Sequence, residues 1–144
     1  PVTPTTVREY RVAERVTVTS GDFFEALPRP MNVILLKSVL HDWNDRDAVR
    51  ILRRAREALA AQGRVLVIER VMPDVVEDRP EHRTTTRSDL NMLVGLGGCE
   101  RTAADYDALL SAAGLSRARM LPAAAAFSVI EATVGQSGAT AATK

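Results

Sequence analysis

The stretch between residues 32 and 69 contains two unbroken apolar runs separated by an amphipathic helical pattern. The runs are Val33-Ile34-Leu35-Leu36 and Val65-Leu66-Val67-Ile68. Such runs are typical of strands buried on both faces of a parallel sheet. Between them, apolar residues recur at helical spacing up to Gln62-Gly63, which supplies the crossover that parallel strands require. This strand–helix–strand order favours an α/β fold.

Local signals extend this pattern over the rest of the chain. Thr102 and Asp105 resemble a capping box with Asp in place of the usual Glu, and Gly114 suits a left-handed helix end. We expect helices at 5–14, 45–61, 86–94 and 102–114, strands at 15–19, 32–37 and 64–69, a surface loop at 72–83, a terminal hairpin of 117–121 with 127–134, and a disordered tail at 135–144. The whole order predicts a doubly wound α/β sheet that ends in an antiparallel hairpin.

Composition limits the class of protein. A length of 144 residues fits one domain, and 19 basic against 18 acidic residues leave no basic field for nucleic acid or an anionic membrane. The single cysteine, Cys99, excludes an internal disulfide and a cysteine-based metal cluster. No apolar stretch approaches the ~20 residues that span a bilayer, and no secretory pattern is present. We therefore expect a cytoplasmic protein.

His41 stands where the first apolar run gives way to polar residues. Ligands of open α/β sheets bind above the carboxyl ends of the strands, and a histidine there can act as a general base near neutral pH. Lys37 and Trp43 flank it and fall at the same edge. The competing interpretation is a structural histidine, followed by Asp42 and Asn44 that simply start the next helix.

Two glutamates can converge on this histidine. Glu69 ends the parallel strand, and Glu100 follows the flexible turn Gly97-Gly98-Cys99. A carboxylate that accepts from an imidazole N–H fixes its tautomer and stabilises the imidazolium. Taken singly, each glutamate is better explained as a solvated charge before a turn; together with His41 they favour a catalytic cluster.

Asp22 and Phe23 follow the first expected strand. Such an Asp can accept hydrogen bonds from ribose hydroxyls or an adenine amine, while Phe23 offers a flat apolar surface. On the residues alone, a Gly-Asp turn with two core aromatics is the stronger interpretation.

Several other sites are excluded. His41-Asp42 resembles a metal-binding pair, but His82 is the one further histidine and it lies in the expected loop, so too few ligands remain and we expect no metal. No phosphate-binding glycine motif follows a strand. Cys99 has no neighbour in sequence that would lower its pKa, so we treat it as incidental.

Considered together, these motifs resemble the S-adenosylmethionine-dependent O-methyltransferases of the caffeate and hydroxyindole type, which include bacterial enzymes that methylate aromatic polyketides. The motifs that carry the resemblance, in order along 15–134, are Gly21-Asp22-Phe23-Phe24, Leu36-Lys37-Ser38-Val39-Leu40-His41-Asp42-Trp43, Val67-Ile68-Glu69, Asp89-Leu90-Asn91-Met92-Leu93 with Gly97-Gly98-Cys99-Glu100-Arg101-Thr102, and Ala112-Ala113-Gly114-Leu115.

The resemblance implies a class I methyltransferase Rossmann-like sheet and a role for each matched residue. His41 would be the general base that takes the proton from the substrate hydroxyl, and Glu69 and Glu100 would orient it. Met92 would line the pocket of a small aromatic acceptor. The residues that would contact the methyl donor S-adenosylmethionine are Asp22, Phe23, Lys37 and Trp43.

The chain also departs from the family pattern. The helical dimerisation domain and the glycine-rich donor loop are absent, Asn32 replaces a usual acid, and Cys99 replaces a frequent basic residue. We therefore interpret residues 1–134 as the C-terminal part of a catalytic domain. We expect it to bind donor poorly and to be nearly inactive alone, and the parent protein to form a homodimer through the missing domain.

Two alternatives to methyl transfer remain open. The chain could be a noncatalytic remnant that binds a ligand or partner. It could also belong to a family member whose pocket performs different chemistry, such as hydroxylation or decarboxylation.

Overall fold

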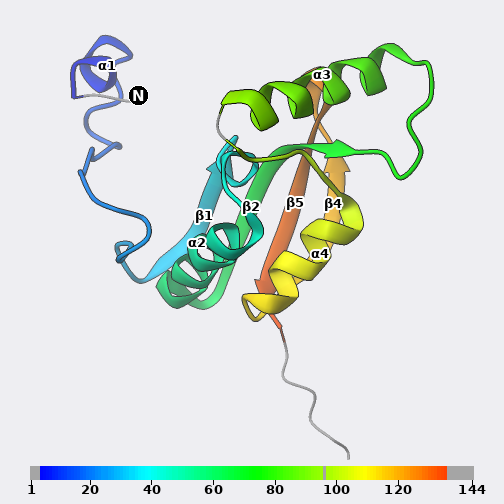
Figure 1. Ribbon diagram of the computed structural model, residues 1–144. Coiled ribbons are helices and arrows are strands. Elements are labelled where there is room, and N and C mark those ends of the chain that lie inside the picture. The colour runs from blue at the N-terminus through cyan, green and yellow to red at the C-terminus, as the bar shows by residue number, and fades with distance from the viewer. Residues whose placement is uncertain (1–3, 96, 136–144) are drawn as a thin grey trace, which may run out of the picture.

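A five-stranded mixed sheet organises the computed structural model, which describes residues 4–95 and 97–135 (Figure 1). Its strands run in the order β1-β2-β5-β4, and the short β3 pairs with the far end of β2. The elements in chain order are α1 (Pro4–Glu9), β1 (Met31–Lys37), the 3₁₀ turn η1 (Leu40–Asp42), α2 (Asp45–Ala58), β2 (Leu59–Met72), α3 (Pro80–Gly95), β3 (Arg101–Thr102), α4 (Ala103–Ala112), β4 (Leu115–Pro122), η2 (Ala124–Ala126) and β5 (Phe127–Val134).

The parallel and antiparallel halves of the sheet meet at β2. β1 runs parallel to β2, with Ile34 opposite Val65 and Leu36 opposite Val67. β5 runs antiparallel to both β2 and β4, so the expected terminal hairpin is confirmed. α2 and α4 cover one face of the sheet, and α3 crosses the end where β1 and β2 finish (Figure 1). That end of the sheet carries the polar residues singled out above.

The core lies between the sheet and the two covering helices. Asn44 caps α2 by accepting from the backbone N–H of Asp47, and the helix then buries one apolar stripe against the sheet. The Thr102–Asp105 capping box that begins α4 is confirmed by both of its reciprocal hydrogen bonds. The fully buried side chains contributed by the helices and strands include Ile51, Leu52, Val65, Val67, Tyr106, Leu110 and Ile130.

The strand expected at 15–19 is wrong. Residues 13–30 form turns and extended backbone, and Val16 and Val18 are exposed. An alternating pattern becomes a strand only where a neighbouring strand takes up its backbone N–H and C=O groups. No described strand pairs with the outer edge of β1 either, and Val33 and Leu35 there are 46% and 55% exposed.

Three helix boundaries also differ from expectation. α1 ends at Glu9 rather than Glu14, because Arg11 adopts a left-handed φ of 54° that a helix cannot continue through. α2 ends at Ala58 because Leu59 already pairs with Met31 as the first residue of β2. α3 begins at Pro80 rather than Thr86, since proline fits the first turn of a helix, where its missing N–H is not needed.

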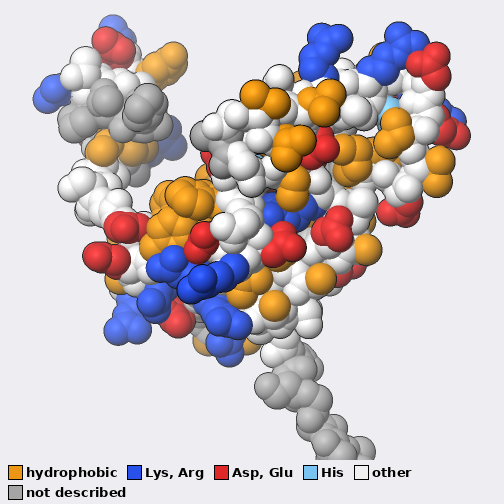
Figure 2. All heavy atoms as spheres, in the orientation of Figure 1, with side chains coloured by type: hydrophobic (Ala, Val, Ile, Leu, Met, Phe, Trp, Pro, Cys, Tyr) orange, Lys and Arg blue, Asp and Glu red, His pale blue; other side chains and the backbone are white. Residues whose placement is uncertain are grey.

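Charge is distributed unevenly over the surface. Lys and Arg side chains gather over α2, which carries Arg46, Arg50, Arg53, Arg54 and Arg56 (Figure 2). Within residues 4–95 and 97–135, no helix combines the length and the apolar character needed to cross a bilayer. Most of the tail expected to be disordered, residues 136–144, lies outside the described residues.

Candidate active site

The loop between β1 and α2 carries His41. Ser38 takes a left-handed φ of 53° directly after β1, and its N–H donates to the carbonyl of Ile68 on β2 at 3.1 Å. Non-glycine residues in this region are uncommon and cluster at sites where the surrounding structure holds the turn. The chain then enters η1, in which Leu40 and His41 are buried. The left-handed turn thus sends His41 inward at the end of the sheet.

His41 meets both glutamates there. Its Nδ1 lies 3.2 Å from Oε2 of Glu69 and 3.6 Å from Oε1 of Glu100, and all three residues are buried. On the other side of the ring, Nε2 lies 3.2 Å from Oδ1 of Asp42. Three segments that are far apart in the chain therefore bring their side chains together, as the sequence led us to expect. We call His41, Glu69 and Glu100 the catalytic cluster, after the role that the sequence predicts for them.

Glu69 performs two structural tasks with its two oxygens. Oε1 accepts hydrogen bonds from the backbone N–H groups of Val39 and Leu40, at 3.0 and 2.9 Å, and so caps the start of η1. Oε2 faces the imidazole without an aligned hydrogen bond. The same fully buried carboxylate thus fixes the backbone of the histidine loop and places negative charge beside the ring.

Glu100 is held by α3 and by the loop that follows it. Its Oε1 accepts from the Ser88 hydroxyl at 2.6 Å, and its backbone N–H donates to Asp89 at 2.8 Å. The N–H of Cys99 donates to the His41 carbonyl at 3.0 Å. A Cβ added to Gly98 would lie 1.8 Å from that carbonyl oxygen, so this close approach of the two loops requires glycine.

Arg101 also holds the histidine loop in place, through hydrogen bonds to its backbone. This side chain is only 2% exposed, and its guanidinium donates to the carbonyls of Leu40 and Trp43, at 2.9 and 2.7 Å. It also pairs with Asp45 in the first turn of α2. One buried cation therefore satisfies two loop carbonyls and ties the loop to the start of the helix.

The surroundings of His41 favour its protonated form. The pKa of His41 is raised above its usual 6.5, first by its contact with Glu100 and then by the charges of Glu69 and Asp42, which together outweigh the opposing effect of burial. The pKa of the Glu69 carboxyl is also raised, chiefly because burial disfavours its charge. His41 therefore holds a proton more tightly than a free imidazole does.

An aromatic group lies beside the loop. Trp43 meets the rings of Phe24 and Phe23 edge-on, with centroids 4.8 and 6.0 Å away. Asp22, at the start of this turn, is exposed and accepts the N–H of Phe24 at 2.8 Å. The turn interpretation of Asp22 is thus correct for the local structure.

Lys37 and Met92, the other two predicted site residues, lie away from the aromatic group. The Nζ of Lys37 sits 4.9 Å from the centre of the Phe127 ring on β5, not over the Trp43 group. Met92 is half-buried on α3, one turn after the Ser88 that contacts Glu100. Within residues 4–95 and 97–135, neither residue forms a hydrogen bond, ion pair or ring contact with the catalytic cluster.

The cluster has the donor atoms of a metal site. One atom each from His41, Glu69 and Glu100 lies within 4.8 Å of the others, so the three could surround a divalent cation.

Two residues that the sequence left outside the site can also be placed. Burial raises the pKa of the Cys99 thiol, which agrees with its interpretation as incidental. His82 lies in the first turns of α3, not in a loop as expected, and accepts the N–H of Glu77.

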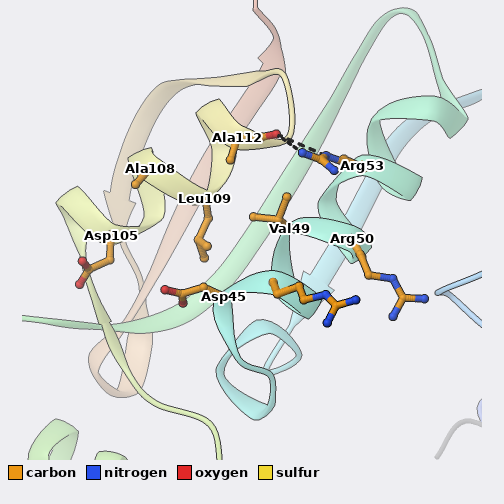
Figure 3. A pocket seen from close by; sticks show the side chains of 9 residues that line it. Asp45, Val49, Arg50, Arg53, Asp105, Ala108, Leu109 and Ala112 are labelled. Carbon is orange, nitrogen blue, oxygen red and sulfur yellow. Dashed lines mark hydrogen bonds between the residues drawn. The ribbon is translucent and has the colours of Figure 1, made fainter.

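A groove between two helices lies away from this cluster. It has a volume of about 610 Å³ and separates α2 from α4, and Arg53 donates across it to the carbonyl of Ala112 (Figure 3). Side chains of both signs face one another there, including Asp45, Arg50 and Asp105. None of the predicted site residues lines it.

Several supporting residues were not predicted as site residues. Ser88 and Asp89 hold Glu100, and Arg101 holds the histidine loop. Tyr106 on α4 is buried, and its pKa is raised by burial and by the charges of Glu69 and Glu100. Asp89 and Arg101 had a signal in the sequence, since both lie inside the matched motifs.

Comparison with known proteins places these features in a family. The O-methyltransferase domain model matches residues 2–116. The chain is 45% identical over 123 residues to O-demethylpuromycin-O-methyltransferase of Streptomyces alboniger, covering 84% of this chain and 32% of that protein. It is 44% identical to aclacinomycin 10-hydroxylase RdmB of Streptomyces purpurascens, covering 74% and 28%.

Solved structures give the same result. The O-methyltransferase NcsB1 from neocarzinostatin biosynthesis, crystallised with S-adenosylmethionine and 2-hydroxy-5-methyl naphthoic acid, superposes with a TM-score of 0.79 at 36% identity, over 91% of this chain and 37% of that one. The methyltransferase fold expected from the sequence is thereby confirmed. The chain spans about a third of the length of the curated relatives it matches. By its motifs, its sheet and its buried histidine–glutamate cluster, this chain belongs to the O-methyltransferase domain family.

Proposed function

We propose that this chain forms part of an enzyme that transfers a methyl group from S-adenosylmethionine to a hydroxyl of a small aromatic molecule. The observation that carries the proposal is the catalytic cluster, in which Glu69 and Glu100 face Nδ1 of His41 at 3.2 and 3.6 Å. The relatives named above include O-demethylpuromycin-O-methyltransferase and an O-methyltransferase from neocarzinostatin biosynthesis, whose structure holds S-adenosylmethionine and a hydroxynaphthoic acid.

The cluster fits removal of a phenolic proton. A phenol has a pKa near ~10 and an unperturbed imidazole near ~6.5, so the transfer becomes favourable only as the hydroxyl oxygen acquires its methyl group. Glu69 and Glu100 raise the affinity of His41 for that proton and stabilise the imidazolium once it forms. S-adenosylmethionine supplies a methyl group already activated on a sulfonium centre. The protein's remaining task is to hold the hydroxyl in line with that methyl group.

The aromatic turn beside the loop fits one side of a nucleoside. Phe23 and Trp43 present half-buried rings, and the exposed Asp22 carboxylate next to them can accept hydrogen bonds from hydroxyl or amine groups. We propose that these three residues hold the adenosine part of the donor and that Lys37, at the end of β1, lies at the edge of the same site. Met92 is assigned to the wall of the acceptor pocket on α3.

The decisive experiment is to replace His41 in the intact protein. His41→Asn should lower the rate of methyl transfer from labelled S-adenosylmethionine by about 10²- to 10⁴-fold, because the base is lost. His82→Asn is the matched control, since His82 caps a loop outside the cluster. Donor affinity should change little in either variant. Methyl transfer that persists in His41→Asn at the rate of the control would remove His41 from the mechanism.

Similarity to a protein named as a hydroxylase keeps a second chemistry under test. Mass spectrometry of the product distinguishes the two, because methylation adds a CH₂ unit and hydroxylation adds an oxygen atom.

We also expect the isolated 144-residue chain to bind S-adenosylmethionine much more weakly than the intact protein, since the outer edge of β1 stands unpaired among the described residues. Parallel calorimetric titrations of the two chains measure this difference.

A further inference from the structure

A small polar pocket lies where α3 crosses the end of β2. It has a volume of about 320 Å³ and is lined by Arg70, Thr84, Arg87, Ser88 and Asn91. We call it the Arg70 pocket. Its volume lies at the lower end of the range for sites that hold small molecules, ~300–1,000 Å³. No acidic residue lines it, and two of its five side chains are arginines.

Neither arginine is neutralised within residues 4–95 and 97–135. The ion pairs found there use eight other arginines and leave Arg70 and Arg87 without a carboxylate partner. Arg70 is nonetheless fixed in place, since its guanidinium carbon lies 4.4 Å from the centre of the Phe127 ring. Its Nε is buried without a hydrogen-bond partner. A buried N–H of a charged group is costly without an acceptor, so this atom is available to donate to a ligand.

The pocket shares a wall with the catalytic cluster. Ser88 lines the pocket, and its hydroxyl donates to Glu100 at 2.6 Å. Glu100 in turn lies 3.6 Å from the His41 ring. Arg70 directly follows Glu69 on β2, so strand alternation directs the two side chains to opposite faces of the sheet. Ser88 and Glu100 therefore connect the pocket to His41, although Arg70 itself points away from Glu69.

The groove between α2 and α4 lacks this character. It also contains arginines, but Asp45 and Asp105 line it too, and Arg53 is engaged by the carbonyl of Ala112. Positive charge without a counter-charge occurs in the Arg70 pocket, next to the proposed chemistry. A planar guanidinium pairs with a carboxylate or a phosphate through two parallel N–H bonds. Of these two groups, the carboxylate is the one found in the aromatic compound bound to a similar enzyme, 2-hydroxy-5-methyl naphthoic acid.

We propose that the Arg70 pocket binds a carboxylate carried by the aromatic methyl acceptor, so that the preferred substrates are hydroxylated aromatic acids. This inference rests on the proposed function for the identity of the acceptor, but its binding chemistry can be tested separately. The carboxylate accepts from Arg70 and Arg87, and the rest of the ring then lies toward Ser88 and the catalytic cluster. The two arginines would select the acceptor and position it.

The test compares two probes that differ only in the carboxylate, 3-hydroxy-2-naphthoic acid and 2-naphthol. Calorimetry on the intact protein, saturated with S-adenosylhomocysteine, should give at least a tenfold lower Kd for the acid. Arg87→Gln and Arg70→Gln should each weaken binding of the acid by about tenfold and leave the Kd of 2-naphthol unchanged. Arg70→Lys should restore part of the loss, since it keeps the charge.

Arg83→Gln is the matched control. Arg83 lies on α3 one turn before Arg87, pairs with Asp78 and does not line the pocket, so both affinities should stay unchanged. Unchanged binding of 2-naphthol shows that a variant is folded. Equal affinity for the two probes, no detectable binding of the acid, or an equal loss in Arg83→Gln would overturn the proposal.

Two further measurements distinguish this proposal from binding of the donor's carboxylate and from the proposed methyl transfer. Weaker binding of S-adenosylmethionine in Arg70→Gln and Arg87→Gln, with unchanged binding of the acid, would assign the pocket to the donor's carboxylate and overturn the proposal. Selective binding of the acid without methyl transfer to any hydroxylated aromatic probe would contradict the proposed function and support the carboxylate site.

Discussion

The histidine loop and the segment before β1 differ sharply in how they are held. The carbonyls of Leu40, His41 and Trp43 all receive donors from residues more than fifty positions away in the chain. In the segment 10–30, by contrast, the hydrogen bonds are mostly local, such as that between Asp22 and Phe24, and most side chains are exposed. One polar segment is thus held by distant parts of the chain, and the other mainly by its own residues.

The difference shows where precision in this site originates. A turn closed by its own residues sets local backbone angles but not a position relative to the sheet. A loop held by Glu69, Gly98 and Arg101 is placed relative to β2, to the loop before β3 and to α2 at once. Catalytic groups need such placement, because small displacements cost large factors in rate.

The largest effect on stability is expected from Arg101→Ala. It would remove the donor of the Trp43 carbonyl, one of the two donors of the buried Leu40 carbonyl, and the partner of Asp45, at a cost of about 3 kcal/mol in the free energy of unfolding. Arg15→Ala, in the exposed segment, should change that energy by less than ~0.5 kcal/mol. Urea unfolding of the intact protein measures both, and equal effects would erase the contrast between the two regions.

A matched pair of glycines tests the same contrast through packing. Gly98→Ala places a methyl group 1.8 Å from the His41 carbonyl oxygen and should cost about 2 kcal/mol, because two loop backbones must separate. Gly21→Ala meets no atom within 4 Å and should be nearly neutral. Thermal unfolding of the two variants decides the matter; a neutral Gly98→Ala would mean that the loops do not touch.

The pH dependence sharpens the view of the catalytic cluster. Since the pKa of His41 is raised above 6.5, the acidic limb of kcat/KM should lie above pH 6.5, where the neutral imidazole becomes available as a base. Glu100→Gln removes the largest cause of the shift and should move that limb to lower pH. NMR titration of the His41 ring in the intact protein measures the same midpoint independently.

The same shift has a defined sign for stability. A histidine whose pKa is higher in the folded state stabilises the fold fully below the pKa of the unfolded chain, and this contribution disappears as pH rises through the folded value. The wild-type protein should therefore lose stability relative to His41→Asn as the pH increases through that range. A difference that stays constant with pH would contradict the raised pKa.

Asp22→Ala should affect folding only slightly. It removes one exposed hydrogen bond to Phe24 and should cost less than ~1 kcal/mol. If Asp22 holds the donor as proposed, the affinity of the intact protein for S-adenosylmethionine should nevertheless fall by about tenfold. Glu25→Ala, in the same turn, is the control for calorimetry, and an identical loss there would remove the specific role of Asp22.

Prediction from the sequence succeeded for features that depend on residues close to one another in the chain. The apolar runs of β1 and β2, the Asn44 cap and the Thr102–Asp105 capping box each depend on residues close in the chain. It failed at 15–19, because a strand needs a neighbour that the alternating pattern does not reveal. It also failed at the start of α3, which falls inside the loop expected at 72–83, because proline is common in loops but also fits the first turn of a helix.

The chain by itself determined which chemical groups are available: one histidine after a buried strand, a glutamate at the end of the next, and a second glutamate after a glycine turn. Only the tertiary structure decided that Ser88 and Arg101 hold these groups, that Lys37 lies over Phe127, and that Arg70 and Arg87 share a pocket without a counter-charge. The physical reason is that burial, hydrogen bonding and charge pairing depend on distances through space, which neighbouring residues in a sequence do not fix.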